Sequence, residues 1–132
     1  MVTHALVFPD SEVAAVCAHG DTLCLRFSAA HVRRLGGPAG AGTDEGYVPG
    51  LELHFSRAHW EGGRLEACVG PLLQAQWREG AGVPPTLALP YASAGPVEAH
   101  FEFRNGERLG VRAAAARIEV PDGWRFLESL AC

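Results

Sequence analysis

The fold class is decided by the stretch EAHFEFRNGERLGVR, residues 98–112. From Val97 to Phe103 apolar and polar residues alternate, so that one face is apolar and the other is polar. A period of two is the pattern of a strand that is half-buried in a sheet. Asn105-Gly106 follows, and this dipeptide is typical of a hairpin turn. The stretch therefore predicts two antiparallel strands joined by a tight turn.

The register of this hairpin follows from which turn keeps apolar residues opposite one another. A two-residue Asn-Gly turn would place Glu102 opposite Leu109 and mix charged with apolar residues on both faces. A three-residue loop over 104–106, with its glycine in the left-handed conformation, instead pairs Phe101 with Leu109 and Glu102 with Arg108. We predict the three-residue loop, because it sets core residues against core residues and opposite charges against each other.

The polar face of this hairpin has two interpretations. In the predicted register Glu98 lies opposite Arg112, and His100 lies between the two charge pairs, opposite Gly110. Antiparallel sheets commonly keep one face in water, so a solvated ladder of charge pairs explains this face without any function. The alternative is a site that uses the open space beside His100, where Gly110 offers no side chain.

Similar strand patterns recur along the whole chain, roughly every 10 residues. They cover 13–28, a hairpin that turns at 19–21 and satisfies two- and three-residue loops equally well, and then 51–55, 71–77, 86–89 and 117–120. No linker or internal repeat divides them. The sequence therefore predicts a single β-domain over residues 1–132, an all-β antiparallel sandwich or barrel built from consecutive hairpins.

A helix is expected in at most one place. Ser28 is a suitable N-cap, and Gly36 a suitable C-cap, for a short helix over AAHVRRL, residues 29–35. The glycine-rich segment 36–50 that follows has no core pattern, so it is expected to form a mobile surface loop, either a lid over a binding site or a tolerated insertion.

The composition excludes several functions. A net charge of −4 opposes binding to a nucleic-acid backbone, so no nucleic-acid partner is expected. All 11 basic residues are arginine, which excludes a Schiff-base or P-loop lysine and fits the codon usage of a GC-rich bacterial genome. No segment approaches the roughly 18 apolar residues of a membrane span, and no signal-peptide pattern is present. We therefore expect a cytoplasmic protein with no membrane partner.

The cysteines, at positions 17, 24, 68 and 132, include no C-x-x-C pair, so zinc-ribbon and thioredoxin-type motifs are excluded. Cys17 and Cys24 could face each other across the predicted hairpin 13–28, depending on its register. In a reducing cytosol they are expected to be free thiols.

Histidine gives the sharpest site hypothesis. Two histidines are expected on outward faces of strands, each with carboxylates at two-residue spacing, and together they give the candidate metal ligands His54, His100, Glu52, Glu98 and Glu102. If the two strands are neighbours in one sheet, these side chains converge and could bind a divalent metal or act as an acid/base pair. A metal-assisted enzyme is therefore the alternative function. Apart from that metal, no cofactor is expected.

Aromatic residues near strand ends suggest a binding function instead. They can line the mouth of a ligand pocket or anchor a protein interface, and the candidates are Trp60, Trp77, Trp124, Tyr47 and Tyr91. Nucleophile motifs of the G-x-S-x-G kind are missing from the sequence. The preferred prediction is a non-catalytic binding module that forms a homodimer, or binds another protein or a small apolar ligand.

Overall fold

The computed structural model describes residues 3–35, 44–80, 82–84, 86–123 and 127–128. All strand pairings in this part of the chain are antiparallel. The strands are β1 (Thr3–His19), β2 (Thr22–Leu35), β3 (Asp44–Val48), β4 (Glu52–Ser56), β5 (His59–Gly62), β6 (Gly70–Glu79), β7 (Leu87–Ala88), β8 (Tyr91–Ala92), β9 (Val97–Phe103), β10 (Arg108–Ala113), β11 (Ala115–Glu119) and β12 (Leu127–Glu128).

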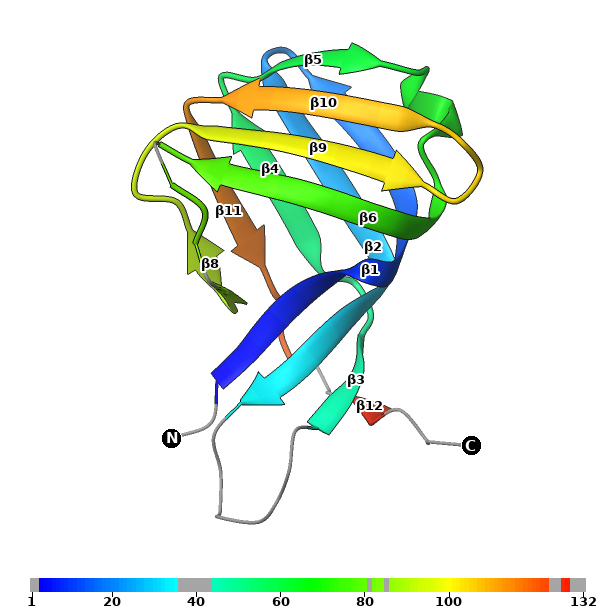
Figure 1. The fold of residues 1–132 in the computed structure, drawn as a ribbon, viewed down its shortest axis with the longest axis vertical. Helices are drawn as coiled ribbons and strands as arrows, with labels where there is room; N and C mark the ends of the chain where they lie inside the picture. The colour runs from blue at the N-terminus through cyan, green and yellow to red at the C-terminus, as the bar shows by residue number, and fades with distance from the viewer. Residues whose placement is uncertain (1–2, 36–43, 81, 85, 124–126, 129–132) are drawn as a thin grey trace.

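The strands form one hydrogen-bonded sheet that is folded over on itself. Its path runs β5-β10-β9-β6-β1-β2-β4-β11-β8, and β3, β7 and β12 pair beside this path. In Figure 1 the strands β5, β10, β9 and β6 form a front layer that lies across β1, β2, β4 and β11 behind it. No pairing between described residues joins β5 to β8, so the sheet is open. The all-β antiparallel prediction is confirmed.

The hairpin of β9 and β10 has the predicted register. Phe101 pairs with Leu109, and Glu102 pairs with Arg108. The backbone N–H of Phe103 donates to the carbonyl oxygen of Glu107 at 2.9 Å, which closes a loop over 104–106. The glycine of that loop has a φ of 93°, the left-handed conformation that the three-residue loop requires.

The hairpin of β1 and β2 resolves the choice that the sequence left open. His19 pairs with Thr22, so the turn has two residues rather than three. Gly20 in this turn has a φ of 59°, which a side chain would disfavour. Further along the same hairpin Cys17 pairs directly with Cys24.

The predicted helix over 29–35 is wrong, because these residues continue β2. They pair with β1 on one side, where Leu6 lies opposite Val32, and with β3 on the other, where Tyr47 lies opposite His31. The N-cap assigned to Ser28 is also wrong, since its hydroxyl donates to Glu12 Oε1 at 2.6 Å. Strand pairing on both sides outweighs the local helix propensity, because intrinsic propensity contributes little free energy compared with tertiary contacts.

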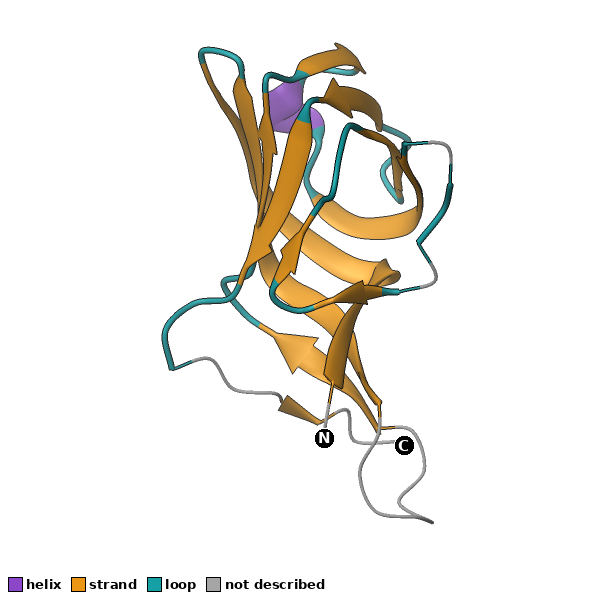
Figure 2. Cartoon of the chain, turned by 90° about the vertical axis from the view of Figure 1, so that its left-hand side faces the viewer, coloured by secondary structure: helices purple, strands orange, loops and turns teal. Residues whose placement is uncertain are grey.

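The loop expected over 36–50 is wrong for Asp44–Val48, which forms β3. This strand pairs with β2 on one side and with β12 on the other. Residues 36–43 lie outside the described residues. The one helical segment of the described chain is the 3-10 helix Leu65–Ala67, which is purple in Figure 2.

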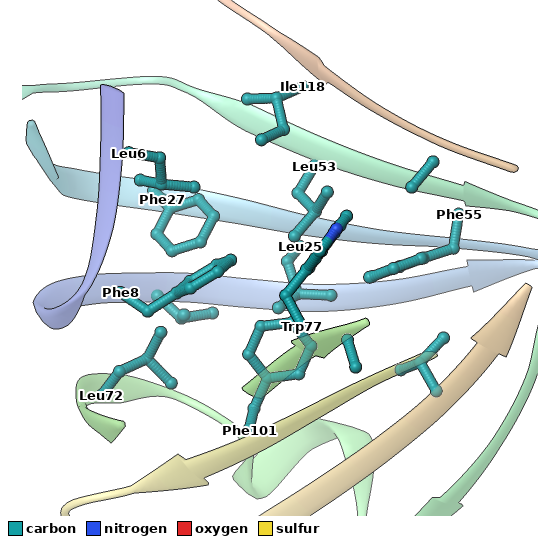
Figure 3. Close-up of a cluster of buried hydrophobic side chains, with 14 of the residues drawn as sticks. Leu6, Phe8, Leu25, Phe27, Leu53, Phe55, Leu72, Trp77, Phe101 and Ile118 are labelled. Carbon is teal, nitrogen blue, oxygen red and sulfur yellow. The ribbon is translucent and has the colours of Figure 1, made fainter. Parts of the chain in front are cut away.

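Aromatic side chains fill the space between the two layers. Figure 3 shows Phe8, Phe55, Trp77 and Phe101 together, contributed by β1, β4, β6 and β9. The Phe55 and Phe101 rings meet edge to face with centroids 6.3 Å apart, a favoured geometry for aromatic pairs. Because every second residue of β4 and β9 is buried here, the residues between them face outward and form the two outer surfaces of the protein.

Candidate functional sites on the two outer faces

The two histidines predicted to share a metal lie on different layers. His54 is on β4 and His100 is on β9, and β6, β1 and β2 lie between these strands along the sheet path. Figure 1 shows β4 and β9 in opposite layers. Phe55 and Phe101 are buried between the layers, so the histidines that precede them point outward. The condition for the metal-assisted alternative, that the two strands be neighbours, is not met. The five candidate ligands divide into a pair on β4 and a set of three on β9.

The outer face of the rear layer carries a compact group of Cys24, Glu52 and His54, which we call the cysteine cluster. Cys24 on β2 lies directly opposite His54 on β4. The imidazole Nε2 of His54 donates to Glu52 Oε1 at 3.1 Å. One ligand atom from each of the three residues lies within 4.8 Å of the other two. The His54 side chain is 17% exposed and the Glu52 side chain 39%, so the histidine is largely shielded from water while the carboxylate remains accessible.

A second carboxylate approaches the cysteine cluster from β11. Glu119 is the direct cross-strand neighbour of Glu52, and its Oε2 lies 3.5 Å from His54 Nε2. Arg117 Nε donates to Glu119 Oε1 at 2.6 Å, and this hydrogen bond is the main cause that lowers the pKa of Glu119. Arg26 lies opposite Glu52 on the other side. Since carboxylates directly opposite one another destabilise a sheet, these cationic neighbours offset a repulsive pair.

The Cys24 thiol is held in its protonated form. Burial, and after it the charge of the Glu52 carboxylate, raise its pKa to about 11. Cys17 is exposed on β1, opposite Cys24, and both are free thiols, as the sequence predicted.

The outer face of the front layer centres on His100. Its Nε2 donates to Glu98 Oε1 at 3.1 Å, and its side chain is 54% exposed. Its direct cross-strand neighbours are Gln76 on β6 and Gly110 on β10. A Cβ atom at Gly110 would lie 3.2 Å from His100 Nδ1, so the imidazole ring leans over the glycine.

Glu102 belongs to the same face and has two partners. Gln74 Nε2 donates to Glu102 Oε2 at 2.7 Å, and Arg108 lies 3.8 Å from Glu102 Oε1. The predicted charge pair between Glu102 and Arg108 is therefore present, although its long distance makes it weak.

A groove runs along this polar face, and we call it the polar groove. Its volume is about 660 Å³, and it is lined by Glu61, Gln74, Gln76, His100, Phe101, Glu102, Arg108, Leu109 and the backbone at 62 and 110. Two smaller hollows, of about 370 and 170 Å³, adjoin it and also reach His100. Three depressions therefore meet at this histidine, and the two larger ones are within the size range of small-molecule sites.

Two of the predicted rim aromatics are structural. Trp77 is buried between the layers, stacks on Phe8 with centroids 5.9 Å apart, and has an indole Nε1 with no hydrogen-bond partner among described residues. Tyr91 packs edge to face against Trp77, and its hydroxyl donates to the Glu79 carboxylate. Both residues pack against the core, and Trp77 also lines the hollow of about 370 Å³ beside His100.

The other three predicted rim residues lie in different parts of the chain. Trp60 lines the smallest of the three hollows beside His100. Tyr47 on β3 stacks on His31 with centroids 5.5 Å apart, on the extension formed by β2 and β3. Trp124 lies outside the described residues. The structure thus brings two predicted aromatics, Trp60 and Trp77, to the hollows beside His100.

Cys24 and Glu119 were missed as candidate ligands from the sequence. A signal for Cys24 was present: Cys24-Leu-Arg26 and Glu52-Leu-His54 are both outward-facing, and pairing arginine with glutamate sets the cysteine opposite the histidine. Nothing local indicated Glu119, because its approach depends on the long-range pairing of β11 with β4.

No protein-family model, no curated protein and no solved structure matches this chain. In the described residues, no helix has both the length and the apolar character to cross a membrane.

Proposed function

We propose that this protein is a non-catalytic binding module whose ligand occupies the polar groove. The observation that carries the proposal is the hollow of about 660 Å³ over Gly110, the one position along this row of the sheet without a side chain. Hollows of this size bury most of a small ligand's surface. The groove lies on paired strands and not on loops, so its polar groups are held in fixed positions.

The lining chemistry favours a neutral ligand rich in hydroxyl groups, such as a mono- or oligosaccharide. Glu61 and Glu102 offer only acceptors, whereas Arg108 offers only donors, and Gln76 offers both. A hydroxyl group donates and accepts, so it satisfies all three kinds of partner. The mixed charges do not select strongly for an anion or a cation. A polar ligand therefore fits this groove better than the apolar one that the aromatic residues suggested.

A thermal-unfolding screen of the purified chain against neutral saccharides tests this function. A saccharide at 100 times its Kd should add about 2.7 kcal/mol to the free energy of unfolding, which raises Tm by several degrees. Gly110→Leu should abolish the shift, because the new side chain fills the groove. Gln76→Ala should weaken it, since a donor and an acceptor are removed. Arg117→Ala, on the opposite layer, should leave it unchanged.

Two outcomes would contradict the proposed function. A wild-type protein that no saccharide stabilises would exclude this ligand class. A shift that survives in both Gly110→Leu and Gln76→Ala would place the ligand elsewhere on the protein.

Self-association is the second part of the proposal. β5 begins the sheet path, and β10 is its one partner strand among the described residues. Two such edges related by a two-fold axis would pair with each other and close a homodimer. Sedimentation velocity should then give a species of twice the 14.0 kDa chain mass as concentration rises. A single monomeric species at all concentrations would contradict self-association.

We also propose a cytoplasmic location. Cys17 and Cys24 are directly opposite each other on adjacent strands and are free thiols, a state that a reducing compartment maintains. Partial oxidation of this pair in air, reversed by a thiol reductant, is the expected behaviour of the purified chain.

A further inference from the structure

We propose that Cys24, Glu52 and His54 bind a divalent cation of the zinc class on the outer face of β2 and β4. This site is separate from the polar groove, which lies on the other layer, so the two proposals stand or fall independently. It also differs from the metal site expected from the sequence, because the third ligand is a cysteine from β2 and not a residue of β9.

The backbone brings the three ligands together before any metal binds. Cys24 and His54 are directly opposite in the register of β2 and β4, and Glu52 is fixed on the same face by the two-residue period of β4. Each strand is paired on both sides, β2 with β1 and β4 with β11, so the ligands stand on the middle of a sheet. Sites built on paired strands hold their geometry better than sites on loops.

The distances suit a tetrahedral ion. With metal–ligand bonds of about 2.0–2.3 Å, the ligand atoms of a tetrahedral zinc lie roughly 3.3–3.8 Å apart. His54 Nε2 and Glu52 Oε1 are already 3.1 Å apart, and all three ligand atoms lie within 4.8 Å of one another. Small side-chain rotations, without movement of the backbone, would therefore complete the ligand triangle.

The donor atoms indicate which metal is preferred. A thiolate sulfur, an imidazole nitrogen and a carboxylate oxygen together suit a borderline-soft ion such as Zn²⁺, and not Mg²⁺ or Ca²⁺, which take oxygen ligands. On binding, the Cys24 thiol releases its proton to solvent, and the His54 proton must reside on Nδ1 so that Nε2 can bind the metal.

A further carboxylate next to the three ligands also favours a cation. Glu119 faces Glu52 directly, and its Oε2 lies 3.5 Å from His54 Nε2. The positive charge of a bound cation would offset the electrostatic repulsion between these two carboxylates. Arg117 holds Glu119 by its other oxygen, so Glu119 stands beside the ion as a positioning residue. Three protein ligands leave the fourth position to water, the arrangement of an open zinc site.

Titration of the reduced, chelator-treated protein with Co²⁺ tests this site, because cobalt replaces zinc and reports its ligands by absorption. We expect one equivalent to bind, with intense tetrahedral bands and a thiolate-to-cobalt charge-transfer band, and Zn²⁺ to displace it. Cys24→Ser should abolish the charge-transfer band. His54→Ala should weaken Co²⁺ affinity by at least about tenfold, because a ligand is lost.

Matched controls come from the same chain. Cys17→Ser removes the neighbouring thiol, and His100→Ala removes the equivalent histidine of the other layer, so both should keep the band and the affinity. The site is refuted if the wild-type protein gives no charge-transfer band at one equivalent. It is also refuted if the band survives in Cys24→Ser or disappears in Cys17→Ser. Far-ultraviolet circular dichroism of each variant separates loss of the site from loss of the fold.

Discussion

β4 and β9 carry the same outward-facing pattern, a glutamate followed two residues later by a histidine. In both strands the histidine Nε2 donates to the glutamate Oε1 at 3.1 Å. One neighbouring strand matches as well: Cys24-Leu-Arg26 of β2 and Gln76-Trp-Arg78 of β6 set an arginine opposite the glutamate. Two distant parts of the chain thus build nearly the same local arrangement on opposite layers.

The strands on the other side differ, and this difference decides what each face can do. Beside β4, β11 supplies Arg117 opposite His54 and a carboxylate, Glu119, opposite Glu52. Beside β9, β10 supplies Gly110 opposite His100 and a cation, Arg112, opposite Glu98. The first histidine is consequently 17% exposed within a cluster of metal-binding atoms, and the second is 54% exposed at a groove. Cross-strand neighbours, more than the strand's own motif, determine the chemistry of each histidine.

The largest expected effect comes from the aromatic pair that supports both faces. Phe55 and Phe101 follow the two histidines directly in sequence and meet between the layers. Replacing either with alanine should lower the free energy of unfolding by about 3–5 kcal/mol, because a large buried ring leaves a cavity. Equilibrium denaturation of both single variants and the double variant measures this. His100→Ala, at an exposed position, should change stability by less than about 0.5 kcal/mol.

The double variant tests whether the two layers are coupled through these rings. Its loss should fall short of the sum of the single losses by roughly 0.5–1.5 kcal/mol, the interaction energy of an aromatic pair. A strictly additive result would mean that each layer is stabilised without the other's ring.

How far the sequence predicted this structure depends on how local each contact is. The register of β9 and β10 was predicted correctly because a three-residue loop and six cross-strand pairs lie within one short stretch. The strand over 29–35 was missed because the alternation changes phase after Phe27, where the pairing of β2 with β1 is irregular and Ala30 and Val32 become the buried residues. A pattern with a shifted phase resembles the spacing of a helix.

The candidate sites show the same limit. Outward positions for His54 and His100 followed from alternation within each strand, and both were predicted. Which strands flank them did not follow, because β2 meets β4, and β6 meets β9, across connections of more than 15 residues. The place of Cys24 opposite His54 therefore emerged only from the sheet order.

A smaller loss of stability is expected from a substitution in the layer that carries the groove, without any effect on the cysteine cluster. Gly62 at the end of β5 has a φ of 127°, and a Cβ there would lie 2.2 Å from the Arg108 carbonyl oxygen. Gly106 has a φ of 93° but open space around it. Both alanine variants carry backbone strain of order 1–3 kcal/mol, and Gly62→Ala adds a clash with backbone that cannot move aside cheaply.

Hydrogen exchange should locate that damage on one layer. Amides of β5 and β10 should lose more protection in Gly62→Ala than in Gly106→Ala, while Co²⁺ binding at the cysteine cluster stays unchanged in both. If both substitutions lowered the free energy of unfolding equally, the close approach of β5 to β10 at Gly62 would not contribute to stability.

Moving the cysteine from one layer to the other sharpens the comparison further. In a Cys24→Ser background, Gln76→Cys sets a thiol opposite His100 in the way that Cys24 faces His54. A thiolate-to-cobalt band should return, with affinity roughly tenfold or more below that of the wild-type cluster, about 1.4 kcal/mol. The reason is that the transferred site is more exposed and has Arg112, a cation, where the first has Glu119. Equal affinities at the two sites would contradict this role for the flanking strand.

The smallest expected effect is on acid titration, where the two glutamate–histidine strands should again differ. The pKa of Glu98 is lowered chiefly by its hydrogen bond from His100, whereas the pKa of Glu119 is lowered chiefly by its hydrogen bond from Arg117. His100→Ala should therefore raise the Glu98 pKa towards its ordinary value, and His54→Ala should move the Glu119 pKa much less. Carboxyl chemical shifts followed by NMR from pH 2 to about 6 measure both.

The sign of the accompanying stability change follows from linkage. A carboxyl whose pKa is lower in the folded protein binds fewer protons there, so its contribution is present above the unfolded-state pKa and is lost as pH falls through the folded-state pKa. His100→Ala should thus make unfolding less dependent on pH in the acid range, by a small amount because Glu98 is exposed to solvent. An unchanged Glu98 midpoint in this variant would mean that Arg78 and Arg112, and not the histidine, set the ionisation of this face. The front layer would then resemble the solvated charge ladder expected from its sequence, and the contrast with the shielded cluster around His54 would become greater.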